Sequence, residues 1–181
     1  MTIIQGTTQV RNGCACEDTL VDVHERPVLK RASGSPRDTN MLKVLVPIDG
    51  SSPSKRAIRH VIQLSQGREP MELHLVNVQE HANAPQLMRF RKTAEIAPAQ
   101  LQHGESVLTA ATRQLDRAGL KYETHVLIGD PAQKIAELAK QGGFEKIVMG
   151  THGRGGISGL LMGSVATKVL HLASIPVTLV K

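Results

Sequence analysis

The chain has 181 residues, of which 40% are hydrophobic and 21% charged, a composition typical of one globular domain with an appendage. No apolar run approaches the roughly 20 residues that cross a bilayer, and no apolar segment follows a basic start, so we expect a cytoplasmic protein without a membrane partner. The formal net charge is +6, but Trp is absent and Phe and Tyr number three in all. This scarcity argues against base stacking, and we expect no nucleic-acid partner.

Residues 1–40 are interpreted as a flexible N-terminal tail, and residues 41–181 as one domain. The tail holds five basic and five acidic residues, so the whole positive excess lies in the domain. It has no sustained strand or helix period and ends in a polar linker over 32–40. Cys14 and Cys16 are the only cysteines. They are either two reduced thiols or a pair that binds a soft metal or responds to oxidation; with only His24 nearby, the first interpretation is favoured.

Strand-like and helix-like segments alternate from residue 41 onward. Residues 43–48 form a compact apolar run typical of a buried parallel strand, and helical spacing begins at Ser52 or Ser54. We expect further strands at 72–78, 122–128, 146–149 and 176–180, and further helices at 98–118, 131–141 and 164–173. Residues 79–98 are ambiguous and are taken as a long loop. The alternation predicts an α/β fold, an open five-stranded parallel sheet of Rossmann-like type with helices on both faces.

Glycines after the fourth expected strand are the most informative feature. Gly150, Gly153 and Gly163-Ser164 form a Gly-x2-Gly-x9-Gly-Ser array ahead of a helix. Glycine lets backbone amides approach a ligand, and a helix N-terminus favours phosphate. Because ligands bind outside the carboxyl ends of parallel strands, Asp49, Val78 and Gly150 should converge. The usual dinucleotide fingerprint and P-loop are both missing from the sequence, which excludes those two nucleotide folds in their usual form.

These residues resemble the universal stress protein family, in the subgroup whose glycine motif binds ATP. The resemblance rests on residues 43–51, residues 129–131 and the array over 150–164, which have the family's order and spacing. It covers residues 41–181 and leaves the tail outside. It implies a fold like that of the adenine nucleotide alpha hydrolases, ATP as ligand with Mg²⁺ as an optional companion, and a homodimer through strand 176–180.

The resemblance also assigns roles to single residues. Asp49 would contact the ribose or adenine side and Val78 the adenine edge, while Gly150 and Gly153 would pass close to ribose and α-phosphate. The β- and γ-phosphates would be held at Gly163–Val165. The expected nucleotide-binding residues are Pro47, Ile48, Asp49, Val78, Met149, Gly150, Gly153, Arg154, Gly163, Ser164 and Val165. Each also has a structural interpretation: Asp49 and the glycines as turn residues, Ser164 as a helix cap, Arg154 as a solvated loop residue and Met149 as packing.

A regulatory protein of the stress response is the expected function, with ATP occupancy modulating conformation, oligomer or partner binding. The alternatives are a slow ATPase or autophosphorylating enzyme and a structural dimer that needs no nucleotide. Efficient phosphoryl transfer needs metal-binding carboxylates and a base, which the sequence does not supply beside Ser164 and Arg154, so no catalytic residue is named. The remaining histidines have no metal-like spacing, are interpreted as surface or packing residues, and lead to no metal site: His60, His74, His81, His103, His125 and His171.

Overall fold

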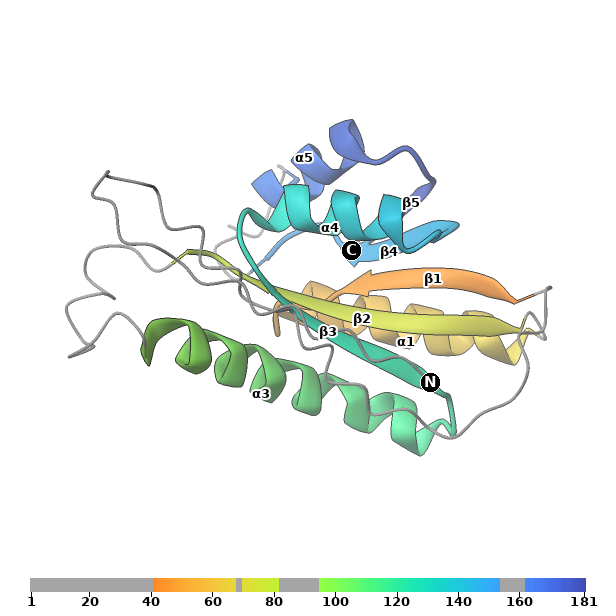
Figure 1. The fold of residues 1–181 in the computed structure, drawn as a ribbon. Helices are drawn as coiled ribbons and strands as arrows, with labels where there is room; N and C mark the ends of the chain where they lie inside the picture. The colour runs from red at the N-terminus through yellow and green to blue at the C-terminus, as the bar shows by residue number, and fades with distance from the viewer. Residues whose placement is uncertain (1–40, 68–69, 82–94, 154–161) are drawn as a thin grey trace, which may run out of the picture.

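Helices and strands alternate through the part of the chain that the structure, a computed structural model, describes: residues 41–67, 70–81, 95–153 and 162–181 (Figure 1). The tail and Arg154 lie outside these ranges. The elements are β1 (Leu42–Pro47), α1 (Ser52–Gln66), β2 (Met71–Gln79), α3 (Ile96–Arg117), β3 (Tyr122–Ile128), α4 (Pro131–Gln141), β4 (Lys146–Gly150), α5 (Ser164–Leu172) and β5 (Val177–Val180). No helix in the described ranges combines the length and the apolar character needed to cross a bilayer.

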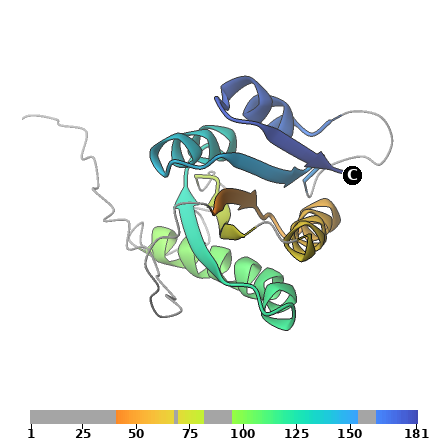
Figure 2. The same ribbon diagram turned by 90° about the vertical axis from the view of Figure 1, so that its right-hand side faces the viewer.

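The five strands form one parallel sheet in the order β3-β2-β1-β4-β5. This confirms the predicted open parallel sheet. Helices α1 and α3 lie on one face and α4 and α5 on the other (Figures 1 and 2). Because the chain adds strands first on one side of β1 and then on the other, the strand order reverses between β1 and β4. Strand β5 lies at one edge of the sheet and β3 at the opposite edge.

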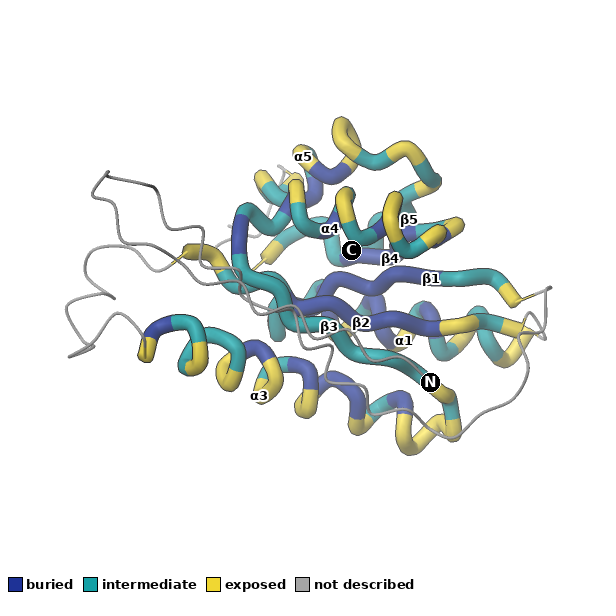
Figure 3. The backbone as a smooth tube through the Cα atoms, in the orientation of Figure 1, coloured by how far each residue is buried: buried dark blue, intermediate teal, exposed yellow. Residues whose placement is uncertain are grey.

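Each face of the sheet has its own apolar core. Val44 and Val46 of β1 pack toward α1 and α3 with Ala57 and Leu108, and all four are buried. Leu45 points to the other face, where residues of α4, β4 and α5 cover it. Adjacent β1 residues are therefore both buried, which explains why the strand reads as a continuous apolar run and not as an alternating one. Figure 3 shows this burial along β1 and β4 and on the inner side of α3.

Local polar chemistry sets where two of the helices begin. Ser51 precedes α1 as its N-cap. Asp130 caps α4, and its Oδ1 accepts hydrogen bonds from the backbone N–H groups of Ala132 and Gln133, both at 3.0 Å. Pro131 is the first residue of α4, where its missing N–H costs nothing. The start of α4 at residue 131 agrees with the helix predicted for 131–141.

Helix α3 begins earlier than expected. The expected start was Pro98, but the helix begins at Ile96, so the proline lies inside its first turn. A proline is tolerated there because the first N–H groups of a helix have no acceptor within the helix. At the other end, Gly119 has φ +67°, the left-handed conformation that glycine commonly adopts just after a helix.

Candidate functional site

The carboxyl ends of β1 and β4 meet where the strand order reverses. A Cβ atom built on Gly153 would lie 2.8 Å from Oδ2 of Asp49, so this carboxylate lies directly against the backbone of the glycine array. Pro47, Ile48 and Met149 are buried at these two strand ends. The structure therefore brings Asp49 and the first half of the array together.

Asp49 also organises the turn that follows β1. Its Oδ1 accepts a hydrogen bond from the Ser51 backbone N–H at 2.9 Å, across Gly50 with φ +85°. The Ser51 hydroxyl donates to the His152 carbonyl at 3.4 Å, which links this turn to the array. Asp49 is thus a turn residue, which was one of its two interpretations from the sequence. The turn orients its carboxylate toward Gly153.

Strand β2 supports the end of β1 through a residue that the sequence analysis missed. Asn77 is 2% exposed, and its side-chain N–H donates to the Ile48 carbonyl at 2.6 Å. The Ile48 N–H donates to the Val76 carbonyl at 2.8 Å. Val78, one residue beyond Asn77, is half-buried against the core under α4 and α5. An asparagine within the apolar run of β2 was the available signal, because a buried amide needs a partner.

Gly150 is close to a helix. A Cβ atom at Gly150 would lie 2.6 Å from Cβ of Pro53 and 2.9 Å from the backbone N of Ser54. Only glycine lets the first turn of α1 pack this closely against the end of β4. Close packing is therefore an explanation for the glycine at position 150, in addition to the expected contact with ribose.

The second half of the array is tied back to the first. The Gly163 N–H donates to the Thr151 carbonyl at 2.8 Å, and a Cβ atom on Gly163 would lie 3.2 Å from Cα of His152. Gly163 is the N-cap of α5 and Ser164 its first residue, so the interpretation of Ser164 as N-cap was wrong. No side chain of the described residues caps α5. The start of α5, with Ser164 exposed and Val165 half-buried, suits an anion, because first-turn N–H groups have no acceptor within the helix.

A cavity of about 330 Å³ opens beside the end of β1. Its lining shares Ile48 with the expected nucleotide contacts and adds Gly50 of the β1–α1 turn. The rest comes from the two helices on that face of the sheet: Lys55, Ser106, Val107, Ala110 and Ala111. The cavity therefore extends the strand-end site toward α1 and α3.

A second group of side chains escaped the sequence analysis. His74 and His125 are 51 residues apart, yet Nδ1 of His74 lies 2.9 Å from Nε2 of His125, and Glu123 is beside them. These histidines have no metal-like spacing along the chain, and the pairing of β2 with β3 is what brings them together; His74 is buried, as expected for a packing residue. A signal was available, since acidic-x-histidine occurs in both strands, at Glu72 in β2 and Glu123 in β3.

Comparison with known sequences identifies a family for the domain. Residues 41–181 match the family described as the universal stress protein family. The universal stress protein MJ0531 of Methanocaldococcus jannaschii is 31% identical over 141 residues, covering 77% of this chain and 81% of the relative. The universal stress protein YxiE of Bacillus subtilis is 30% identical over 146 residues, covering 77% and 98%.

Solved structures share the fold. The hypothetical protein MJ0577 has a TM-score of 0.67 at 25% identity, covering 78% of this chain and 96% of that one. A universal stress protein in complex with cAMP has a TM-score of 0.59 at 22% identity, covering 79% and 99%. A family protein from Arabidopsis thaliana with AMP bound has a TM-score of 0.55 at 20% identity, covering 77% and 91%.

Proposed function

The chain belongs to the universal stress protein family, and we propose that it is a regulatory protein of the stress response that binds ATP at the glycine array. Nucleotide occupancy would modulate its conformation, its oligomeric state or its binding of a partner protein. The observation that carries the proposal is the junction at the ends of β1 and β4. There the Asp49 carboxylate lies against Gly153, and the Gly163 N–H is bonded to the Thr151 carbonyl.

The two ends of the junction suit different parts of a nucleotide. A carboxylate accepts hydrogen bonds and repels phosphate, so Asp49 suits ribose hydroxyls. The start of α5 offers N–H groups and the positive end of the helix dipole, which suits phosphates. Because the Gly163 N–H is used within the loop, we assign the phosphate hydrogen bonds to the amides of Ser164 and Val165.

Solved relatives support an adenine nucleotide as the ligand class. Family structures hold cAMP and AMP, and both ligands share adenine, ribose and one phosphate. The assignment of ATP, with Mg²⁺ as an optional companion, rests on the Gly163-Ser164 end of the array. This end would hold the phosphates that AMP lacks.

Asp49 and Gly163 give the sharpest test of the nucleotide site. Asp49→Asn keeps an oxygen for the Ser51 N–H but removes the charge, so we expect ATP affinity to fall about 10- to 100-fold, as for a lost charged hydrogen bond. Gly163→Val adds a side chain against His152 and should abolish binding. Binding is measured by calorimetry with Mg-ATP, and the urea midpoints of the free proteins control for unfolding.

Two results would overturn the proposal. One is wild-type protein that releases no adenine nucleotide on heating and shows no thermal shift with Mg-ATP. The other is unchanged affinity in both variants. Phosphate release is measured in parallel with Ser164→Ala, because turnover above that variant's level would favour the slow ATPase over a purely regulatory protein.

We further propose that residues 41–181 act as one domain behind a flexible tail, in the cytoplasm, and as a homodimer. The dimer is assigned to β5, because an edge strand presents unpaired backbone groups to another chain. Leu170 and Leu172, on the helix before β5, are 40% and 51% exposed and add apolar surface. Light scattering should give the mass of two chains, and a single-chain mass at every concentration would contradict the dimer.

A further inference from the structure

Strands β2 and β3 carry the same pattern of a glutamate two residues before a histidine. Glu72 and His74 lie on β2, and Glu123 and His125 lie on β3. In the parallel register His74 is opposite Glu123 and Val76 is opposite His125. Residues two apart on a strand share a face, so all four side chains start from the face that α4 and α5 cover. The fold thus gathers two imidazoles and two carboxylates beside the β3 edge.

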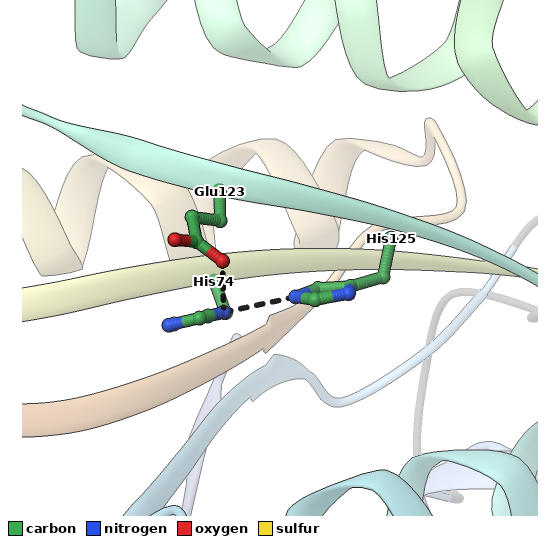
Figure 4. A group of neighbouring side chains, drawn as sticks. All are labelled: His74, Glu123 and His125. Carbon is green, nitrogen blue, oxygen red and sulfur yellow. Dashed lines mark hydrogen bonds and ion pairs between the residues drawn. The ribbon is translucent and has the colours of Figure 1, made fainter. Parts of the chain in front are cut away.

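Three ligand-type atoms of this group converge in Figure 4. Nδ1 of His74 lies 2.9 Å from Nε2 of His125 and 3.7 Å from Oε2 of Glu123. The candidate ligand atoms lie within 4.8 Å of one another. A tetrahedral zinc ion with bonds of about 2.0–2.2 Å spaces its ligand atoms about 3.3–3.6 Å apart. The separations of His74 Nδ1 from His125 Nε2 and from Glu123 Oε2 bracket that spacing, so side-chain adjustments within the cluster would complete the geometry.

The ring of His74 is held in the orientation that a ligand needs. Its Nε2 lies 2.8 Å from Oε1 of Glu72, and this contact directs the N–H to the carboxylate and leaves the Nδ1 lone pair for the cluster. Phe144 packs edge-on against the ring, with centroids 4.8 Å apart and the planes at 89°. The His74 side chain is 4% exposed. A carboxylate behind a histidine is the arrangement by which proteins orient metal-binding imidazoles.

The surroundings of the cluster leave room for another ligand. Lys43 lies 3.6 Å from Glu72 and 4.9 Å from the ring centre of Phe144, on the side of His74 away from the converging atoms. The Glu123 side chain is 34% exposed, so water can reach the group from that side.

We propose that His74, His125 and Glu123 bind a divalent transition-metal ion, zinc foremost, with water completing the coordination and Glu72 orienting His74. Two imidazoles and one carboxylate suit zinc and its first-row neighbours, whereas calcium and magnesium prefer oxygen ligands alone. His74 precedes Val78 by four residues, about 13 Å along the strand, so this site is separate from the nucleotide site. A bound ion would tie the edge strand β3 to β2.

Zinc binding to the full chain without an affinity tag tests the proposal. The protein carries Cys14→Ser and Cys16→Ser so that the tail thiols contribute nothing, is stripped with chelator, and is titrated calorimetrically with zinc chloride or magnesium chloride. We expect about one zinc ion per chain and no magnesium binding. Glu123→Gln and His125→Ala should lose stoichiometric binding, and His103→Ala, on the exposed side of α3, should keep it.

Two further measurements separate a metal site from a structural cluster. Glu72→Gln should weaken zinc binding about 10- to 100-fold with unchanged stoichiometry, because the carboxylate orients the ligand but does not touch the ion. Cobalt(II) should bind with a low coordination number and therefore absorb visible light intensely. Glu123→Gln should abolish this absorption. Metal-free urea midpoints show that each variant is folded. Absence of zinc binding, or equal binding by wild type and a folded Glu123→Gln, would identify a hydrogen-bonded histidine pair and overturn the proposal.

Discussion

Replacing Gly150 by alanine tests the close packing of α1 against the end of β4. The added Cβ would lie 2.6 Å from Cβ of Pro53, 2.8 Å from its carbonyl carbon and 2.9 Å from the backbone N of Ser54. Carbon atoms prefer separations of about 3.5–4.0 Å, so the nearest contact is short by about 1 Å. Two of the three atoms belong to the backbone, so relief requires moving the first turn of the helix.

The expected cost of Gly150→Ala follows from two opposing terms. Overpacking of this kind costs about 1–3 kcal/mol, and backbone contacts favour the upper part of that range. Replacing a glycine outside the left-handed region by alanine stabilises the fold by about 0.4–1 kcal/mol, because the unfolded chain loses conformational entropy. We therefore expect a net loss of about 2 kcal/mol, which for an m-value of about 2 kcal/mol/M lowers the urea midpoint by about 1 M.

Gly153→Ala is the matched control for this experiment. Among the described residues, its Cβ would meet the side-chain carboxylate of Asp49, at 2.8 Å from Oδ2, and a side chain adjusts more readily than a helix backbone. We expect a urea midpoint near that of wild type but weaker ATP binding, because the carboxylate moves. The reasoning on Gly150 is refuted if Gly150→Ala unfolds at the same urea concentration as wild type.

Two further substitutions test the supports around the strand ends. Asn77→Ala leaves the Ile48 carbonyl without its buried donor and should cost about 1–3 kcal/mol in urea unfolding; an unchanged midpoint would show that this bond contributes nothing. Asp130→Ala should lower the free energy of unfolding by about 1 kcal/mol. Asp130→Asn should lower it much less, because an asparagine side chain can cap α4 as the native aspartate does. The backbone N–H of Gln133 foremost, and the charge of Lys168, lower the pKa of Asp130 below its ordinary 3.8. A depressed pKa stabilises the fold above the unfolded-state value, so the deficit of Asp130→Ala should shrink as pH falls below about 4, and a deficit that grows would contradict the sign.

The sequence predicted most where structure depends on neighbours along the chain. Strand β3 and helix α4 have the predicted bounds, because the turn at Asp130-Pro131 and the apolar spacing are local signals. The start of α3 was two residues off, because proline suits a first turn as well as a boundary. Helix α5 begins at Ser164 as predicted, although its N-cap is Gly163 and not Ser164.

The parts that the sequence did not reveal depend on which strands lie side by side. The contact of Gly150 with Pro53 needs the position of β4 next to β1, and the bond from Asn77 to Ile48 needs β2 on the other side. His74 and His125 meet only because β2 and β3 pair in one of several possible registers. A one-residue slip would turn His125 to the opposite face, so the acidic-x-histidine pattern of the two strands does not by itself determine that this pair meets.

The central place of β1 has a consequence for how the protein is made. Its neighbour β2 follows within 30 residues, whereas the Lys43 N–H bonds to Oε2 of Glu145, 102 residues away. At about 5–20 residues per second, a ribosome needs several seconds to deliver β4, α5 and β5 after β3. During that interval β1 is the outer edge of a three-stranded half-sheet, and the face that bears Leu45 waits for α4 and α5. A strand that is central in the finished sheet is thus an edge open to chaperones, and to aggregation, during synthesis.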